Sequence, residues 1–433
     1  DNFPLLGNVL GVPLVHNVAE RGKFIVTLIA VHAIGNGNQV MNVVIIVLET
    51  MSASTTILLT QHIGAGKKGE ACDEIATVGV AVSGFFSLLM GLILLLAPHV
   101  IFTLLRTPAE AFDGACLYTR IVGGAVVLQG LYIELCAVLR SYTLLREVVC
   151  VSVVMNLMNV AGNAILIFGL GFDVAGVAIP TLVSRTVAAV VIVWLLFNEK
   201  LELHLSDIRA FRFEKRVMRN IFRIAIPSGV ENGMFHFGRL ILFSLISTFG
   251  TASITANAIG NTMGNFHVFA GQAICMGLTT VVSQCVGAGA YDRARYYMKK
   301  LTVATYAVMA FINITLILCI PLILRVYDVA PEAAVLAREV MLIHGGSAIL
   351  LWIPSFMIPY FLRAAGDATY TMVVSMLTMW LVRVLGAYVI GRYLGYGVVG
   401  VWFAHAILDW ATRSVIFYAR YRSGKWERMA IRS

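Results

Sequence analysis

The chain has 433 residues, of which 59% are hydrophobic and only 13% are charged, and its mean hydropathy is +0.86. A soluble domain carries about 25% charged residues, so this composition excludes a soluble protein and predicts a polytopic membrane protein. The net charge is +9. Nearly all of the excess base lies in short loops between apolar stretches, which indicates membrane orientation and argues against nucleic-acid binding.

Twelve apolar stretches are long enough to cross a bilayer as helices, each of which needs about 20 residues. The first of them is interrupted by polar residues between His16 and Lys23. The pattern predicts an all-α polytopic membrane protein with twelve transmembrane helices. The expected spans are about 5–30, 40–62, 76–98, 116–138, 148–169, 174–197, 221–247, 254–285, 302–324, 337–361, 370–391 and 397–419.

Basic residues mark one side of the membrane. They are concentrated in alternate loops, among them Lys67 and Lys68, the segment 198–220 and the C-terminal tail. Cytoplasmic loops carry the excess of lysine and arginine. We therefore expect both termini to be cytoplasmic, in a multi-pass protein of the cell (inner, cytoplasmic) membrane.

The sequence contains an internal repeat. The segment QHIGAGKKGEA at 61–71 recurs as QCVGAGAYDRA at 284–294. Nearly the same offset separates matching residues along the whole half, and such a constant offset indicates duplication. We therefore expect three parts, namely an N-terminal six-helix bundle (1–197), a basic cytoplasmic linker (198–220) and a C-terminal six-helix bundle with a short cytoplasmic tail (221–433).

The even number of spans in each half makes both halves face the same way. Their axis would then lie along the membrane normal, as in transporters built from parallel repeats. This predicts a central cavity between the halves that opens to either side in turn. No HExxH, P-loop, GxSxG or dinucleotide fingerprint occurs, and the cysteines form no CxxC pair, so we expect no enzyme, no metal site and no cofactor. An ion gradient, of H⁺ or Na⁺, would have to drive transport.

Ionisable side chains inside the spans are the candidates for ion coupling, because each costs several kcal/mol there unless it faces water or a partner. Glu20 in the first span would bind a proton or Na⁺, or would pair with Arg21 or Lys23. Glu49 and Glu134 stand alone in the second and fourth spans, and either is a further candidate for a cavity acid.

Glu231 is the second main candidate for ion coupling. It lies one helical turn after Pro227 in the seventh span, where proline leaves backbone carbonyls free for an ion or a substrate. The alternative is a carboxylate at the cytoplasmic end of the helix, paired with Arg223 or Arg239.

Two further charged positions favour structural roles. Arg383 is a lone cation in the eleventh span, and we expect it to pair with a carboxylate across the same half. Asp409 and Arg413 share a face of the twelfth span, where the spacing favours an intrahelical ion pair.

Asparagines form two stripes at helical spacing. One stripe lies in the fifth span and the other in the eighth, where it continues to Asn265. Each stripe would line the cavity or bond to a neighbouring helix. The candidate residues of the substrate cavity are Asn17, Asn156, Asn159, Asn163, Asn257, Asn261 and Arg383.

Several motifs together resemble a known family. The Gln-x-x-Gly-Ala-Gly segments are joined by Leu-Arg-Ala-Ala-Gly-Asp at 362–367, Met-Trp…Arg at 379–383 and Gly-Val-Trp…Asp-Trp…Arg at 400–413. They resemble the multidrug and toxic compound extrusion (MATE) exporters over nearly the whole chain. The resemblance implies two six-helix bundles that form a V-shaped central cleft. It also implies efflux of small amphipathic, often cationic compounds in exchange for H⁺ or Na⁺, and we expect a monomer.

The chain departs from the family pattern at the coupling positions. The family's first span carries Asn-x-x-Asp, and here Asn17-x-x-Glu20 has Glu in place of Asp. The position of a proton-binding Asp in the fifth span of some branches matches Asn163, which cannot titrate. No acid occurs in 340–361, where other branches have one. We therefore expect coupling through Glu20 or through Glu231.

Other functions are compatible with the same pattern. A lipid-linked oligosaccharide flippase of the same superfamily would usually have a more cationic cavity, whereas Arg383 is the only strong candidate for such a cation in this sequence, which counts against this alternative. A major-facilitator transporter shares the duplication but normally has an Asp-Arg-rich loop after its second span, where this chain has GAGKKGE. A non-transporting scaffold or receptor is a further alternative. A membrane enzyme would need a converging cluster of His, Asp or Cys that the sequence does not suggest.

Overall fold

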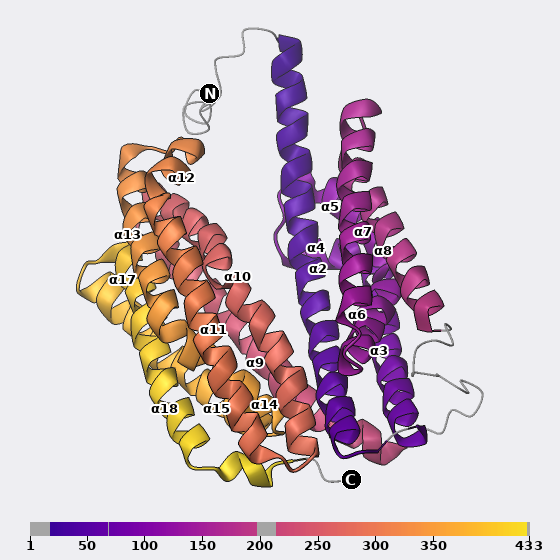
Figure 1. The fold of residues 1–433 in the computed structure, drawn as a ribbon. Coiled ribbons are helices and arrows are strands. Elements are labelled where there is room, and N and C mark those ends of the chain that lie inside the picture. Colours follow the sequence, from indigo (N-terminus) through magenta and orange to yellow (C-terminus); the bar gives the residue numbers. More distant parts are fainter. Residues whose placement is uncertain (1–17, 68, 197–213, 431–433) are drawn as a thin grey trace. The chain divides into compact units, whose positions relative to one another are not determined.

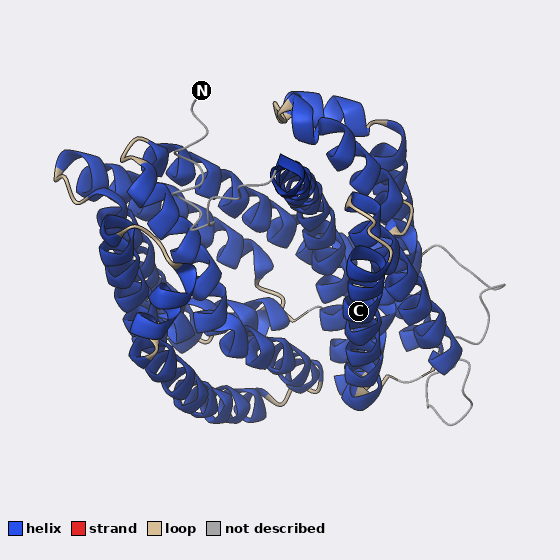
Figure 2. Ribbon diagram, turned by 90° about the horizontal axis from the view of Figure 1, so that it is seen from above, coloured by secondary structure: helices blue, strands red, loops and turns tan. Residues whose placement is uncertain are grey.

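The computed structural model describes residues 18–67, 69–196 and 214–430. Within these ranges every regular element is a helix, and most of the connections are short (Figure 1, Figure 2). The described residues divide into two compact units, an N-terminal unit within Val15–Ala225 and a C-terminal unit within Ile226–Ser433. The boundary lies inside α9 (Lys215–Ser247). This helix begins a few residues before the expected start of the seventh span at 221.

The N-terminal unit consists of long apolar helices and one short connecting helix. A bend of 49° separates α5 from α6, next to Gly123 and Gly124, and the two helices together form one broken span. The last turn of α7 continues as a π-helical segment, η1. The elements are α2 (Val18–Gly64), α3 (Glu70–Leu96), α4 (Pro98–Leu104), α5 (Ala109–Gly123), α6 (Val126–Ser141), α7 (Leu145–Ala164), η1 (Ile165–Gly169) and α8 (Val174–Leu196).

The expected break between the first two spans is wrong. A single helix of 47 residues, α2, runs through the segment 31–39 without interruption. That segment holds two glycines but no proline, so it keeps every backbone donor, and glycine costs a helix only about 1 kcal/mol relative to alanine. One of these glycines, Gly37, also serves packing. The ring of Tyr118 on α5 lies where a Cβ of Gly37 would be, 2.4 Å from the ring's Cδ1.

The C-terminal unit repeats this plan but contains more π-helix. Four π-helical segments (η3, η4, η5 and η6) interrupt its later spans, and η7 is a short 3₁₀ helix. The elements after α9 are α10 (Thr251–Gly287), α11 (Tyr291–Leu318), α12 (Ile320–Tyr327), α13 (Pro331–Ser347), η3 (Ala348–Met357), α14 (Ile358–Ala364), α15 (Ala368–Thr378), η4 (Met379–Val384), α16 (Leu385–Ala387), η5 (Tyr388–Tyr393), α17 (Gly397–Phe403), η6 (Ala404–Asp409), α18 (Trp410–Arg422) and η7 (Lys425–Arg428).

Eight helices of the described residues are long and apolar enough to cross a membrane, and the bent pair α5–α6 makes a ninth span. They coincide with nine of the twelve expected spans. The seventh and twelfth expected spans, α9 and the run from α17 to α18, are helical too. They are less apolar because α9 carries Glu231 and Arg239, while the latter run carries Asp409 and Arg413. The first expected span lies partly outside the described residues and otherwise within α2.

The duplication is visible in the backbone as well as in the sequence. Gly66 and Gly289, which are the second glycines of the two Gly-Ala-Gly segments, follow α2 and α10 with φ of 75° and 68°. Glycine adopts this left-handed conformation without the steric cost of a Cβ, and it ends helices for that reason. The short helices α4 and α12 then take equivalent places after α3 and α11.

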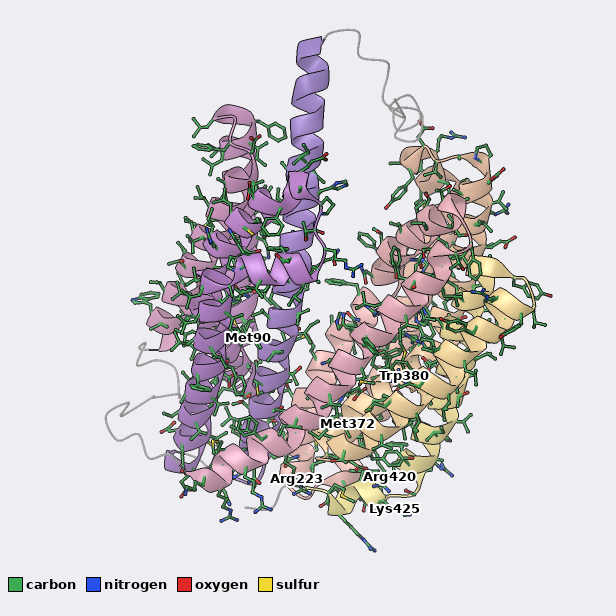
Figure 3. All side chains as sticks on the ribbon, turned by 180° about the vertical axis from the view of Figure 1, so that it is seen from behind. Met90, Arg223, Met372, Trp380, Arg420 and Lys425 are labelled. Atoms are coloured by element: carbon green, nitrogen blue, oxygen red, sulfur yellow. The ribbon has the colours of Figure 1, made fainter. Side chains whose placement is uncertain are left out.

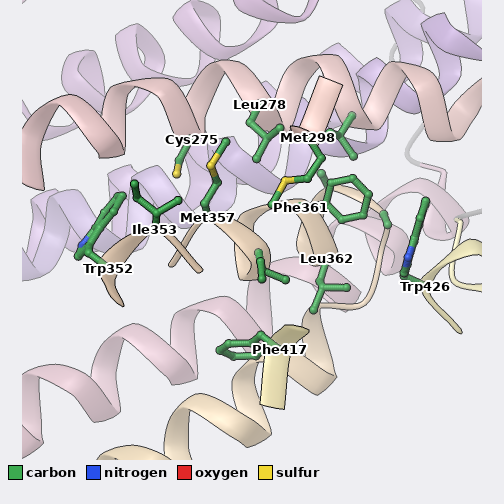
Figure 4. Packing of buried hydrophobic residues seen from close by; sticks show 14 of the residues in the cluster. Cys275, Leu278, Met298, Trp352, Ile353, Met357, Phe361, Leu362, Phe417 and Trp426 are labelled. Atoms are coloured by element: carbon green, nitrogen blue, oxygen red, sulfur yellow. The ribbon is translucent and has the colours of Figure 1, made fainter. Parts of the chain in front are cut away.

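Small residues and aromatic rings hold the C-terminal unit together. A Cβ on Gly260 would lie 2.5 Å from Val340 Cγ1, so the absence of a side chain lets α10 approach α13 closely, as the small-residue face of α10 predicts. Nearer the C-terminal end of α10, the buried core contains Trp352, Phe361 and Trp426 (Figure 4). This packing fixes the helices that carry the buried charges described next.

Candidate functional site

Two buried charges on neighbouring π-helical segments form an ion pair. Arg383 on η4 donates two hydrogen bonds to Asp409 Oδ2 at the end of η6, at 3.0 Å from Nε and 2.7 Å from Nη2. Their side chains are 3% and 0% exposed. The expected pairing of Arg383 with a carboxylate across the half is confirmed. π-Helical turns are frequent at functional sites, because they change the direction in which side chains point.

The expected ion pair between Asp409 and Arg413 is wrong. The π-helical segment η6 ends at Asp409 and shifts the register, so the carboxylate meets η4 instead of the next turn of its own helix. Arg413 instead donates from Nη2 to Ser375 Oγ at 3.0 Å, while its Nε and Nη1 have no partner among the described residues. The guanidinium lies over the rings of Phe235 and Phe356, 5.2 and 4.6 Å from their centroids, and such contacts offset part of the cost of burying a charge.

Glu231 takes part in a second buried ion pair. Its Oε2 lies 3.2 Å from Nη1 of Arg363, with side chains 5% and 18% exposed. The expected alternative partners, Arg223 and Arg239, are therefore not the ones that bind it. Arg363 belongs to the Leu-Arg-Ala-Ala-Gly-Asp motif, whose last residue, Asp367, accepts a hydrogen bond of 2.8 Å from Arg420.

The charged side chains around Arg383 include more cations than carboxylates. Among the described residues, Arg363, Arg383 and Arg413 lie near two carboxylates, Glu231 and Asp409. Arg239, exposed on α9, lies in the neighbourhood of Arg383. In Figure 3, Trp380, next to this layer on η4, lies nearer the middle of the unit than Arg420 and Lys425 at its end. Sequence reasoning identified only Arg383 as a strong cavity cation.

The asparagines of α10 separate into two environments. Asn257 is buried and its Oδ1 accepts a hydrogen bond of 3.2 Å from Trp402 Nε1 on α17, so it bonds to a neighbouring helix. Asn261 and Asn265 are exposed. Each step of four residues turns a helix by about 40°, so a stripe at i, i+4 and i+8 leaves the face on which it began.

The asparagines of α7 bond mainly within the unit. Asn159 Nδ2 donates to Thr181 Oγ1 of α8 at 3.1 Å, and Asn163 Nδ2 donates to Asn159 Oδ1 at 3.3 Å. Asn156 is exposed and donates to the Ser152 carbonyl one turn earlier at 2.8 Å.

The expected acids of the first half lie in different surroundings. Asn17 lies outside the described residues, and so does the side chain of Glu20, whose backbone belongs to α2. Glu49 is exposed on α2, whereas Glu134 on α6 is fully buried. Arg185 on α8, a cation that sequence reasoning missed, lies near Tyr118 of α5, and a lone arginine within an apolar span was its signal.

A pair of histidines is a further feature that the sequence did not suggest. His267 Nδ1 on α10 lies 2.9 Å from His344 Nδ1 on α13, and both side chains are buried. One nitrogen must donate and the other accept, which fixes the tautomers. Among the described residues no cluster of three His, Cys, Asp or Glu side chains suited to a metal ion occurs.

Comparison with known proteins identifies the family. The sequence pattern of the MatE family matches residues 26–165 and 227–389. An uncharacterized transporter of Bacillus subtilis, YisQ, is 28% identical over 92% of this chain and 87% of its own length. A probable multidrug resistance protein of Thermotoga maritima, NorM, is 24% identical over 93% and 86%. A crystal structure of a MATE protein in the straight conformation superposes with a TM-score of 0.86 at 18% identity, covering 92% of this chain and 89% of that one.

These matches cover both halves of the repeat, and the fold that they share is the all-α, polytopic one described above. The chain is a membrane protein of a transporter family. It belongs to the MatE family, the multidrug and toxic compound extrusion transporters.

Proposed function

We propose that this protein is a secondary active exporter that moves small amphipathic or cationic compounds out of the cell in exchange for H⁺ or Na⁺, by alternating access. The observation that carries the proposal is the pair of buried carboxylate–arginine contacts on helices of the C-terminal unit, with Glu231 the carboxylate that faces Arg363. A buried ion pair is expensive to maintain, and in transporters such groups mark ion and substrate pathways.

The mechanism follows from the two possible partners of Glu231. In the described state its carboxylate is held by Arg363 at 3.2 Å. A proton or Na⁺ that binds Glu231 would replace this arginine as its counter-charge and release the contact between α9 and α14. Substrate binding would then favour the state in which the ion pair forms again, so that ion and substrate exclude one another. Glu20 is the corresponding candidate in the N-terminal half.

The proposed substrate surface combines apolar rings and amides. Asn261 and Asn265 are exposed on α10 beside Phe266, which is 58% exposed, and Phe237 on α9 is 54% exposed. Flat rings with a few polar groups accept varied amphipathic molecules, because recognition depends on shape and apolar area more than on a fixed set of hydrogen bonds. The proposed cavity residues are those expected from the sequence: Asn17, Asn156, Asn159, Asn163, Asn257, Asn261 and Arg383.

Relatives support the substrate class and the location. The names of relatives in Thermotoga maritima and Staphylococcus haemolyticus refer to multidrug resistance and multidrug export. For this chain we propose the cell membrane, cytoplasmic termini, a monomer and no cofactor beyond the coupling ion.

The test is efflux of ethidium, a fluorescent lipophilic cation, from lipid vesicles that contain the purified protein. A pH gradient and a Na⁺ gradient are imposed separately on wild type, Glu20→Gln, Glu231→Gln and the control Glu332→Gln, whose residue lies in the first turn of α13. We expect one gradient to drive efflux, and loss of that efflux in Glu231→Gln or Glu20→Gln but not in Glu332→Gln. Undiminished efflux in both variants would show that other carboxylates couple transport.

A lipid-linked oligosaccharide flippase is a second candidate, because the structure groups Arg239 and Arg413 with Arg383. Such a cationic group suits the phosphate groups of a lipid-linked sugar. Ethidium efflux under neither gradient, together with transfer of a fluorescent lipid-linked diphosphate sugar between leaflets, would favour this candidate.

A further inference from the structure

Glu134 on α6 is a buried carboxylate without a counter-charge. Its exposed fraction is 0%, and neither Oε1 nor Oε2 has a hydrogen-bond partner among the described residues. No arginine, lysine or histidine of those residues comes within ion-pair distance of it. Glu134 therefore differs from Glu231 and Asp409 of the other unit, each of which has an arginine as its counter-charge.

Two neighbouring helices form a small cradle for the carboxyl group. On α3, a Cβ added to Gly79 would lie 2.6 Å from Glu134 Oε1 and 2.7 Å from Thr55 Oγ1 of α2, so the glycine leaves the space that the carboxyl occupies. The Thr55 hydroxyl donates to the Met51 carbonyl at 3.4 Å. While its proton is directed to this carbonyl, the hydroxyl can act toward Glu134 as an acceptor, which suits a protonated carboxyl.

The charged and titratable groups around this cradle are few and lie at its margins. Among the described residues, Arg140, further along α6, is the charged residue that lies within electrostatic range of Glu134. Arg185 lies on α8, which also packs against α6, but its neighbour is Tyr118 of α5 rather than Glu134. Tyr132 on α6 is bonded to Ser152 of α7. Glu49 on α2, which also lies in range of Arg140, is exposed. Where α2 and α3 meet the carboxyl, they present the Thr55 hydroxyl and Gly79.

The repeat provides an internal comparison. The two Gly-Ala-Gly segments of the repeat are separated by the same number of residues as Arg140 and Arg363. Moving Glu134 by that number reaches Met357 on η3, which is fully buried. The same offset relates Gly79 to Thr302, whose hydroxyl lies 3.6 Å from Met357 Sδ. One half of the molecule thus fills this place with an uncharged side chain of similar length. The surroundings in both halves are those of a neutral group.

We propose that Glu134 is a proton-binding site of the N-terminal unit, held as a neutral carboxylic acid in the described state and deprotonated when movement of α2 or α3 admits water. The O–H of the acid would donate to Thr55 Oγ1, and on release the proton passes to water and leaves the carboxylate. The role in transport rests on the ion-coupled export proposed above, and it assigns H⁺ as the coupling ion. Na⁺ fits poorly, since it prefers several oxygen ligands and the cradle supplies one hydroxyl besides the carboxyl.

Infrared spectroscopy of the purified protein tests the protonation state without any transport assay. The carbonyl stretch of a protonated carboxyl is separated from that of a carboxylate and shifts in D₂O. We expect this band in wild type, its loss in Glu134→Gln, and its retention in Glu110→Gln, which removes an exposed acid from α5 of the same unit. A band that is absent in wild type, or unchanged in Glu134→Gln, would overturn the proposal. If Glu134→Gln does not fold, Glu134→Met, which copies the residue at the equivalent place in the other half of the repeat, is measured instead.

Transport in vesicles tests the second part. We expect pH-driven ethidium efflux to fall by at least about tenfold in Glu134→Gln, while exchange of ethidium without a gradient persists, because glutamine imitates the neutral acid. Efflux at the wild-type rate would refute the role of Glu134 in coupling. If wild type moves no ethidium at all, the proposed function fails instead, and the infrared result alone decides whether Glu134 binds a proton.

Discussion

Arg383 on η4 and Asp409 on η6 are joined by two hydrogen bonds to one carboxylate oxygen, within a region that excludes solvent. The pair connects the two helical runs that end the C-terminal unit, where the π-helical segments η4 and η6 of these runs meet. An isolated charge at either position would be strongly destabilising in this environment, and that makes the pair a test of the structure.

We expect Arg383→Met to lower the free energy of unfolding by about 3–5 kcal/mol, because it leaves the Asp409 carboxylate buried and unpaired. The double variant Arg383→Met/Asp409→Leu should recover most of this loss, since well-packed apolar side chains replace a buried pair at little cost. Thermal unfolding in detergent measures both. The control is Arg392→Met on the same helical run, where the side chain is exposed. Equal destabilisation by the single and the double variant would show that the pair does not exist as described.

Gly400 lies where the structure leaves no space for a side chain, so we expect the stability of the protein to be sensitive to substitution there. A Cβ at this position would lie 2.9 Å from the backbone nitrogen of Gly391 and 2.9 Å from the carbonyl carbon of Ile390, so α17 and η5 meet backbone to backbone. We expect Gly400→Ala to cost roughly 1–3 kcal/mol, because a backbone has no rotamer with which to give way. Gly277→Ala on α10, where no atom lies within 4 Å, is the matched control. A melting temperature that is unchanged in Gly400→Ala would contradict this close approach.

Trp426 packs the short helix η7 (Lys425–Arg428) against the core of the C-terminal unit. The ring is fully buried and makes an edge contact with Phe361 at a centroid distance of 4.7 Å (Figure 4). It makes a second edge contact with Tyr291 at 5.7 Å. Its Nε1 donates to the Tyr421 carbonyl at 3.1 Å. We expect Trp426→Ala to destabilise the protein by about 3–5 kcal/mol, the usual cost of removing a large buried ring. Trp194→Ala, at a position that is 67% exposed, should change the melting temperature far less.

The buried guanidinium of Arg413 lies over aromatic rings, and we expect these contacts to stabilise its charge. Three phenyl rings surround its guanidinium, including Phe356 at 4.6 Å. We expect Phe356→Leu to destabilise the protein by about 2 kcal/mol or more, the value of a desolvated cation–π contact, beyond the loss of apolar contact. The change should be smaller in an Arg413→Met background, where there is no cation to stabilise. A double-mutant cycle on melting temperatures measures the coupling, and independent effects of the two substitutions would rule out this contact.

The sequence predicted the helical class and most of the spans, because apolar runs of sufficient length have few other structures available in a membrane. It also predicted that Arg383 would find a carboxylate. It did not predict which one, since π-helical turns leave no mark in the pattern of apolar residues. The same turn explains why the spacing of Asp409 and Arg413 suggested an intrahelical pair that does not form.

Other features depend on contacts between residues far apart in the chain. The hydroxyl of Thr55 and the glycine at 79 meet Glu134 only after three helices pack, so no local pattern reveals the cradle. His267 and His344 are brought together in the same way. The unbroken helix through 31–39 illustrates the opposite error, because the expected spans left a break there although the backbone had no reason to leave the helix.

The most direct test of the account is the ion movement that accompanies substrate. Vesicles that contain the protein are loaded with a pH-sensitive or a Na⁺-sensitive dye, ethidium is added outside without any imposed ion gradient, and the internal ion concentration is followed as ethidium enters. We expect entry of ethidium to be accompanied by exit of H⁺ or Na⁺, and Glu231→Gln or Glu20→Gln to abolish this coupled exit. Entry of ethidium at the same rate with neither ion moving would contradict the proposed antiport.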